Sequence, residues 1–157
     1  MAKKFESTER FLKPDPRYRS RLVAKFINNL MRRGKRSTAE RIFYRAAEVV
    51  EERHPGVDFL QFFEQAVQNI KPHVEVRSKR VGGANYQVPV QVTPRRQTAL
   101  AMRWLLTGAR QRKGKPMHIR LADELCDAHR REGFAYTQRE NTHRMAEANK
   151  AFAHFAW

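Results

Sequence analysis

The chain has a single cysteine among its 157 residues, Cys126, so an intrachain disulfide is excluded. On an apolar helical face, this cysteine is interpreted as a small core residue. The sequence also lacks an apolar run of membrane-spanning length, and its first 20 residues lack the apolar centre of a secretory signal. We therefore expect no membrane partner and a cytoplasmic location, with an organellar matrix or stroma as the alternative if a presequence has been removed.

Patterns of catalytic and metal-binding residues are also lacking. The six histidines show no metal-ligand spacing, and only one thiol could join them. Gly82 and Gly83 do not stand between a strand and a helix, as a dinucleotide phosphate loop would. The adjacent acids Asp123 and Glu124 are interpreted as solvated helix charges. The sequence thus predicts no catalytic residue, no metal and no cofactor, and it argues against an enzyme.

Acidic residues are scarce relative to basic ones. Lys and Arg number 32 against 16 Asp and Glu, which gives a formal net charge of +16. Charge of this size opposes compaction and favours a polyanionic partner, nucleic acid ahead of an anionic membrane. Hydrophobic residues still make up 41% of the chain, so we expect a single folded domain over residues 1–157.

Apolar residues recur at helical spacing in six segments, which predicts a mainly α-helical domain of about six helices. The last two helices are expected at about 116–131 and 140–155. The other four are expected to begin after residues that can cap a helix N-terminus: Ser20, Ser37, Asp58 and Thr93.

Basic residues gather outside these predicted helices. Residues 1–19 lack apolar periodicity and are expected to form an extended basic N-terminal tail. The turn at 32–36 is basic, and the loop at 110–115, which contains no acid, is predicted to be exposed. Lysine and arginine grouped in this way suit contacts with phosphates.

Residues 73–92 predict a protruding two-stranded β-hairpin arm between the third and fourth helices. Apolar and polar residues alternate over 73–81 and over 86–92, and residues 82–85 tolerate the positive φ of a tight reversal. Pro89 is acceptable because both strands of such a ribbon are edges. Strands of about nine residues would make an arm ~30 Å long. The tip is assigned to Gly82, Gly83, Asn85 and Tyr86.

The charge of the arm leaves two interpretations open. Arg77, Lys79 and Arg80, with two arginines just after the arm, face only one acid, Glu75. In the first interpretation, the ribbon folds back on its own domain and these cations are solvated. In the second, the arm projects and lays its cations against phosphates, since a strand pair fits a nucleic-acid groove. Because no signature of base-by-base readout is present, recognition of the shape and backbone of folded RNA fits better.

Several segments in this order resemble the bacterial-type S-seven family of small-subunit ribosomal proteins. They are the first two helices with Gly34-Lys35-Arg36 between them, the arm VEVRSKRVGGANYQVPVQVTPRR, the segment ALAMRWL and the late segment HRMAEANKAFAH. The resemblance covers almost the whole chain and implies a helical domain with a protruding β-hairpin. The chain departs from the family at residues 134–139, where a lysine-rich run is usual.

The resemblance also implies a function. It implies a structural constituent of the small ribosomal subunit that is a primary binder of the 3′ major domain of 16S-type rRNA and nucleates assembly of the head. The implied position is near the exit (E) site, close to tRNA and mRNA, with proteins of the S-nine and S-eleven families as neighbours. Some members also bind their own mRNA. Carried onto matching positions, the expected rRNA contacts are Lys35, Arg36, Arg77, Lys79, Arg80, Arg95, Arg96 and Arg103.

Two other classes of function are weighed against this one. A DNA-architectural protein could grip duplex DNA with a β-arm, although such arms usually belong to small dimers with few helices. Preference for plain duplex DNA over a folded rRNA junction at matched salt would favour that class. An RNA-processing enzyme would need an exposed cluster of acids, histidines or metal ligands, and turnover of RNA by the pure protein would reveal it.

Overall fold

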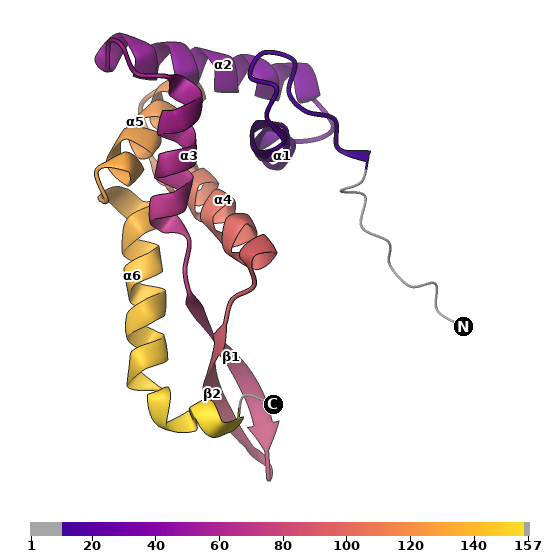
Figure 1. Ribbon diagram of the computed structural model, residues 1–157, viewed down its shortest axis with the longest axis vertical. Helices are drawn as coiled ribbons and strands as arrows, with labels where there is room; N and C mark the ends of the chain where they lie inside the picture. The colour runs from indigo at the N-terminus through magenta and orange to yellow at the C-terminus, as the bar shows by residue number, and fades with distance from the viewer. Residues whose placement is uncertain (1–10, 156–157) are drawn as a thin grey trace.

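The computed structural model describes residues 11–155, and within them the chain is mainly helical (Figure 1). These residues form six α-helices, one hairpin and a 3₁₀-helix. They are α1 (Arg21–Leu30), α2 (Arg36–Arg53), α3 (Phe59–Ile70), β1 (Val74–Val81), β2 (Ala84–Gln91), α4 (Pro94–Gln111), α5 (Met117–His129), α6 (Gly133–Ala148) and η2 (Lys150–Phe155). The expected helical fold, with an antiparallel β-hairpin between the third and fourth helices, is confirmed. No helix among the described residues is long and apolar enough to cross a bilayer.

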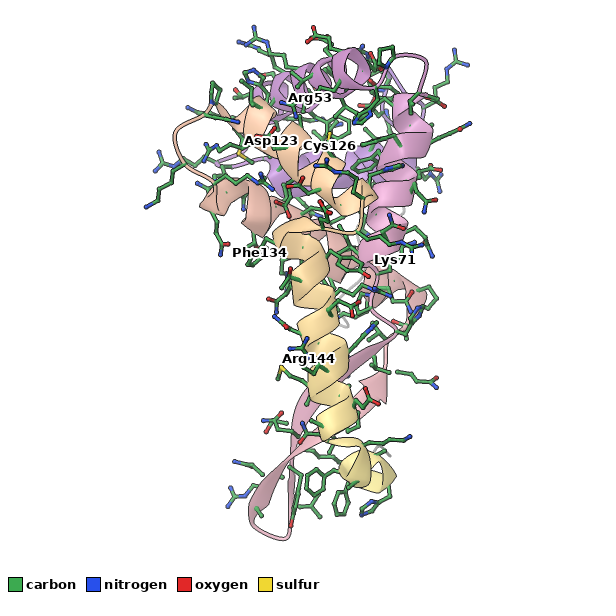
Figure 2. The ribbon with its side chains drawn as sticks, turned by 90° about the vertical axis from the view of Figure 1, so that its left-hand side faces the viewer. Arg53, Lys71, Asp123, Cys126, Phe134 and Arg144 are labelled. Carbon is green, nitrogen blue, oxygen red and sulfur yellow. The ribbon has the colours of Figure 1, made fainter. Side chains whose placement is uncertain are left out.

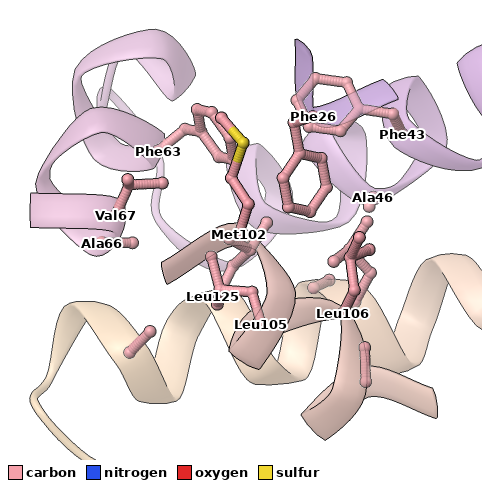
Figure 3. Close-up of a cluster of buried hydrophobic side chains, with 14 of the residues drawn as sticks. Phe26, Phe43, Ala46, Phe63, Ala66, Val67, Met102, Leu105, Leu106 and Leu125 are labelled. Carbon is pink, nitrogen blue, oxygen red and sulfur yellow. The ribbon is translucent and has the colours of Figure 1, made fainter. Parts of the chain in front are cut away.

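The core of the helical body is built from the apolar stripes of five helices (Figure 3). Phe26, Phe43 and Phe63 come from α1, α2 and α3, and their ring centroids lie 5.2 to 5.6 Å apart in tilted or edge-to-face arrangements. Leu125 of α5 is fully buried in the same cluster, and Cys126 beside it is only 7% exposed, which confirms its assignment as a core residue. Burial of these aromatic rings, each worth up to ~3 kcal/mol, is the main force that holds the helices together.

The hairpin turn contains only Gly82 and Gly83. Both have positive φ, +58° and +88°, which is the backbone of the two-residue turns that match strand twist. The two strands therefore pair up to Val81 and Ala84, and the second strand begins before residue 86, where the sequence predicted its start. Asn85, which the sequence assigned to the tip, lies in β2 instead and pairs with Arg80 of β1.

One face of the hairpin is covered by the C-terminal part of the chain. The ring of Tyr86, also assigned to the tip, lies in β2 with its centroid 5.3 Å from that of Phe152 and 5.1 Å from that of Phe155 in η2. On the same face, Lys79 donates from Nζ to the carbonyl oxygen of Phe155 at 2.9 Å. Val88 is only 1% exposed. The arm thus leaves the helical body together with α6 and η2 (Figure 1). It projects, as the second interpretation expects, but one of its faces is covered by the C-terminal part of the chain; contact of its cations with phosphates stays a prediction.

Two helix starts differ from the sequence expectations. The N-cap of α2 is Lys35 and its first residue is Arg36, so Ser37 lies inside the first turn. The Glu40 carboxylate that a capping box would use instead accepts a hydrogen bond from Nε of Arg36 at 2.8 Å. Helix α6 begins at Gly133, not near residue 140, because the positive φ of Gly133, +82°, lets a new helix start directly after α5.

Residues 11–19, the described part of the segment expected to be an extended tail, pack against α2. Asp15 is 1% exposed. Its carboxylate accepts hydrogen bonds from the Tyr44 hydroxyl at 2.7 Å and from the backbone N–H groups of Arg17 and Tyr18 at 3.1 and 3.0 Å. These bonds fold the segment back toward the helical body. The rest of the expected tail, residues 1–10, lies outside the described residues.

Candidate nucleic-acid interface

Three arginines form a row along α4. Arg96, Arg103 and Arg110 are seven residues apart, close to two full helical turns, so they lie on one side of the helix. All three are exposed. At a rise of ~1.5 Å per residue, the row is about 21 Å long. We call this set the α4 arginine row. It connects the base of the arm with the end of α1, where Arg110 donates to the Leu30 carbonyl at 3.3 Å.

A nearly buried acid organises the arm end of the row. Glu75, 7% exposed, accepts from Nε of Arg77 at 2.8 Å through Oε1 and from Nε of Arg96 at 3.3 Å through Oε2. Burial alone would raise the pKa of Glu75, but the hydrogen bonds and charges of the two arginines outweigh it and lower the pKa. The two guanidinium groups remain 60% and 43% exposed as side chains. Because each has five N–H donors, they keep donors free for a phosphate.

The other end of the row opens into a cationic hollow of about 380 Å³. Arg32 and Lys35 reach it from the α1–α2 turn, Arg110 from α4 and Arg120 from α5. Its floor is apolar: Leu30, Met31, Ala39, Ile42 and Met117. No acid lies among the described residues that line it. Burial, and then the charge of Arg32, lower the pKa of Arg110.

The residues expected to contact rRNA are not all brought together. Arg77 and Arg96 meet at Glu75, Arg103 lies in the row, and Lys35 lines the hollow. Three others are not part of the α4 arginine row or of its two ends. Arg36 is bound to Glu40 and Asn28, Arg95 is exposed in the first turn of α4, and Lys79 donates to the Phe155 carbonyl in η2. Arg80 is on the opposite face of the hairpin from Arg77, because side chains alternate along a strand.

Three cations of the hollow were missed as site residues by the sequence reasoning. Arg110 could have been found from its seven-residue spacing after Arg96 and Arg103. Arg32 belongs to a turn already identified as basic. Arg120 carries no such signal, since it reaches the hollow only because α5 packs beside α4.

The loop expected to be freely exposed at 110–115 is partly structural. Arg112 donates to Oε2 of Glu124 at 2.7 Å and also pairs with Asp127. Its carbonyl oxygen accepts from Nη1 of Arg120 at 2.6 Å. Arg112 is therefore committed to the fold, and the exposed cations of this segment that remain are Arg110, Lys113 and Lys115.

The interpretation of Asp123 and Glu124 as solvated charges is wrong. Glu124 is 0% exposed, and besides Arg112 it accepts the backbone N–H of Ala135 at 2.9 Å, which ties α5 to the first turn of α6. Asp123 pairs with Arg53 of α2 at 2.7 Å, close to Cys126 in Figure 2. Both carboxylates hold helices in place, which fixes the ends of α4 and α5 that present the hollow.

Two histidines have a pKa below the ordinary histidine value. Nε2 of His143 accepts the backbone N–H of His73 at 3.1 Å, which a protonated ring could not do. Burial lowers the pKa of His143, and Arg139 and His73 lower it further against the opposing effect of Glu140. The ring of His129 stacks on Phe62 with centroids 4.2 Å apart.

Burial, and then the charge of His54, also lower the pKa of His129. Since the unfolded chain binds protons at these two sites at a higher pH than the folded chain, the free energy of unfolding is expected to rise with pH there. The contribution of these two histidines to stability should be fully present above the ordinary histidine pKa of 6.5 and should be lost as the pH falls through their lowered pKa values.

Urea unfolding at several pH values between 5 and 8 measures this dependence. The variant H143Q keeps an acceptor for the His73 N–H but cannot titrate, so we expect a shallower decline of stability toward low pH. H154Q is the control, because His154 is exposed. Equal slopes for wild type and H143Q would contradict the assignment.

No group of three or more metal-ligating residues occurs within residues 11–155.

Comparison with known proteins identifies the family of this chain. A family model described as Ribosomal protein S7p/S5e matches residues 2–150. A small ribosomal subunit protein uS7 from Rhodopirellula baltica is 60% identical over 144 residues, which are 91% of this chain and 92% of the relative. Proteins of the same name from Syntrophobacter fumaroxidans and Thioalkalivibrio sulfidiphilus are 54% and 53% identical over 157 residues, the full length of both partners. These matches confirm the resemblance drawn from the sequence, and the chain belongs to the ribosomal protein S7p/S5e family.

Proposed function

We propose that this chain is a structural protein of the small ribosomal subunit that binds the 3′ major domain of 16S-type rRNA through the α4 arginine row and its two ends. The observation that carries the proposal is the continuity of charge from Arg77 and Arg96 at Glu75, along α4, to the hollow at Arg110. The family is structural and not enzymatic, and the relatives are named as small-subunit proteins, which supports this role.

The form of this surface favours folded RNA over duplex DNA. A regular duplex presents phosphates and groove edges but no unpaired base. The hollow beside Arg110 joins an apolar floor, which includes Met31 and Met117, to a rim of cations. Such a site suits an unpaired base together with its phosphate, which loops, bulges and junctions of folded RNA supply. The DNA-architectural alternative gains no support, since one face of the arm is covered by α6 and η2.

The finer roles belong to the same proposal and rest on membership of the family. They are nucleation of the head, a position near the exit site with contacts to tRNA and mRNA, and contacts with proteins of the S-nine and S-eleven families. Binding of the chain's own mRNA and a cytoplasmic location on the ribosome complete the proposal. Footprinting of the protein on naked small-subunit rRNA tests the central point, because protection confined to the 3′ major domain is expected.

A competition experiment separates RNA from DNA. Fluorescently labelled rRNA fragment from the 3′ major domain is bound to the protein, and unlabelled duplex DNA or unlabelled fragment is added at matched salt. We expect the fragment to compete at least tenfold better. If plain duplex competes equally well, the proposed function is wrong.

The arm makes a separate prediction. Joint replacement of Arg77, Lys79 and Arg80 by alanine should weaken binding to the fragment and lower the slope of log affinity against log salt. A fall of about 1 to 2 is expected rather than the full value for three phosphates, since the three cations do not share a face. Titration by fluorescence anisotropy at several salt concentrations gives the slope, and an unchanged slope would remove the arm from the interface.

A further inference from the structure

A second hollow lies away from the α4 arginine row, between the C-terminal half of α3 and the first turns of α6. Its volume is about 310 Å³, and Gln68, Lys71, Arg131, Tyr136 and Arg139 are among its lining residues. Figure 2 shows Lys71 beside the N-terminal part of α6, where Phe134 is labelled. The elements that form this hollow are not those that form the row, so the two surfaces are separate.

The charge of this α3–α6 hollow is positive and only partly compensated. No acid is among the described residues that line it. Arg139 is engaged, because its Nη1 pairs with Glu140 at 2.6 Å and its Nε donates to the Lys71 carbonyl at 3.4 Å. Nζ of Lys71 donates to the neutral amide oxygen of Gln68 at 2.9 Å. Neither Lys71 nor the exposed Arg131 forms an ion pair with a carboxylate within residues 11–155. The positive charges of Lys71 and Arg131 are therefore available to bind an anion from another molecule.

A flat surface adjoins these charges. The guanidinium carbon of Arg139 lies 5.3 Å from the centroid of the Tyr136 ring, and both side chains line the hollow. Aromatic rings and arginine planes are the groups on which unpaired bases stack. The amide of Gln68 is held by Lys71 and offers further hydrogen-bonding capacity at the same place.

We propose that the α3–α6 hollow binds a nucleotide of an unpaired RNA strand, with its phosphate between Lys71 and Arg131 and its base against Tyr136 and Arg139. This adds a second RNA-binding surface to the one in the proposed function. The hollow has room for about one nucleotide, and a duplex keeps its bases inside and could not place one there. The protein would thus hold two RNA segments at once, one on the α4 arginine row and one beside α6.

The test uses the full-length protein already bound to the rRNA fragment, so that the α4 arginine row is occupied. A decamer of uridines that carries 4-thiouridine is the probe, and its affinity is measured by anisotropy at several salt concentrations. The variant K71Q/R131N removes both uncompensated charges. Gln at 71 keeps the backbone carbonyl bound by Arg139, and Asn at 131 tolerates the positive φ of that position, +63°. The control R41Q/R45Q removes two exposed charges from α2.

We expect K71Q/R131N to weaken decamer binding about fivefold or more and to lower the salt slope by about 1.4, at ~0.7 for each of two phosphates of a single strand. The control should change little, and irradiation should attach the decamer to the peptide that contains Tyr136. Equal losses in variant and control, or crosslinks only outside the residues that line the hollow, would overturn the second surface. If K71Q/R131N also lost the rRNA fragment, the hollow would belong to the first surface, which likewise overturns this proposal. Failure of the wild-type protein to bind the fragment would instead refute the proposed function, and titration of the free protein with the decamer would still test the hollow.

Discussion

Replacement of Glu124 by alanine is expected to lower the free energy of unfolding by about 3 kcal/mol. The carboxylate is 0% exposed and is shared between the Arg112 guanidinium and the backbone N–H of Ala135. Its loss would leave the part-buried Arg112 guanidinium with Asp127 as its remaining anion and would leave a buried N–H without an acceptor. It would also leave a void beside Gly108, where an added Cβ would lie 2.6 Å from Oε1 of Glu124.

Urea unfolding followed by circular dichroism measures this loss. E124Q keeps an acceptor for the Ala135 N–H and nearly the same volume, so it should lose roughly half as much stability as E124A. E64A is the control, because Glu64 is exposed on α3 and should change stability by less than about 0.5 kcal/mol. A loss below about 1 kcal/mol in E124A would show that the buried acid is not a major support of the fold.

The largest expected effect on binding comes from the α4 arginine row. Joint replacement of Arg96, Arg103 and Arg110 by glutamine should weaken binding to the rRNA fragment on the order of 100-fold near 0.1 M salt and should lower the salt slope by about 2 to 3. The reason is that three exposed cations on one side of a helix can follow consecutive backbone phosphates, and two of them also form the ends of the surface, at Glu75 and at the hollow.

The matched control is R21Q/R41Q/R45Q, which makes the same change in net charge on α1 and α2. The arginines of both sets are exposed, so both triple variants should fold, and melting temperatures within a few degrees of wild type would verify this. If the control lost as much affinity and slope as the row, total charge rather than position would explain the binding. The interface would then have to be sought elsewhere on the protein.

The features that followed from the sequence are those set by neighbours along the chain. Apolar residues at helical spacing, such as Phe26 and Phe63, are buried because a helix has one face to bury, whatever it packs against. The double glycine at 82–83 specified the hairpin, and Thr93 followed by Pro94 specified the start of α4, because both depend on local backbone angles.

The features that did not follow are set by contacts between distant elements. Glu124 looks solvated in the sequence because its adjacent residue is another acid, whereas its partners Arg112 and Ala135 come from other elements. The start of α6 was missed because Gly133 was interpreted as the end of the preceding helix, whereas α5 ends at His129 and Gly133 is the first residue of α6, whose first turn contacts Glu124. The cationic hollow exists only because the α1–α2 turn meets α4 and α5, so its members could be listed as basic but not placed together.

The cover over the arm imposes an order on how the protein matures. Lys79 and its partner Phe155 are 76 residues apart, and η2 follows every other described element. During translation, the strands therefore emerge long before the segment that covers Tyr86. Until η2 has been synthesised, the hairpin is exposed, and its unpaired strand edges could pair with other strands. A chain that stops near residue 149 would lack η2 and would therefore leave the Tyr86 face of the hairpin uncovered.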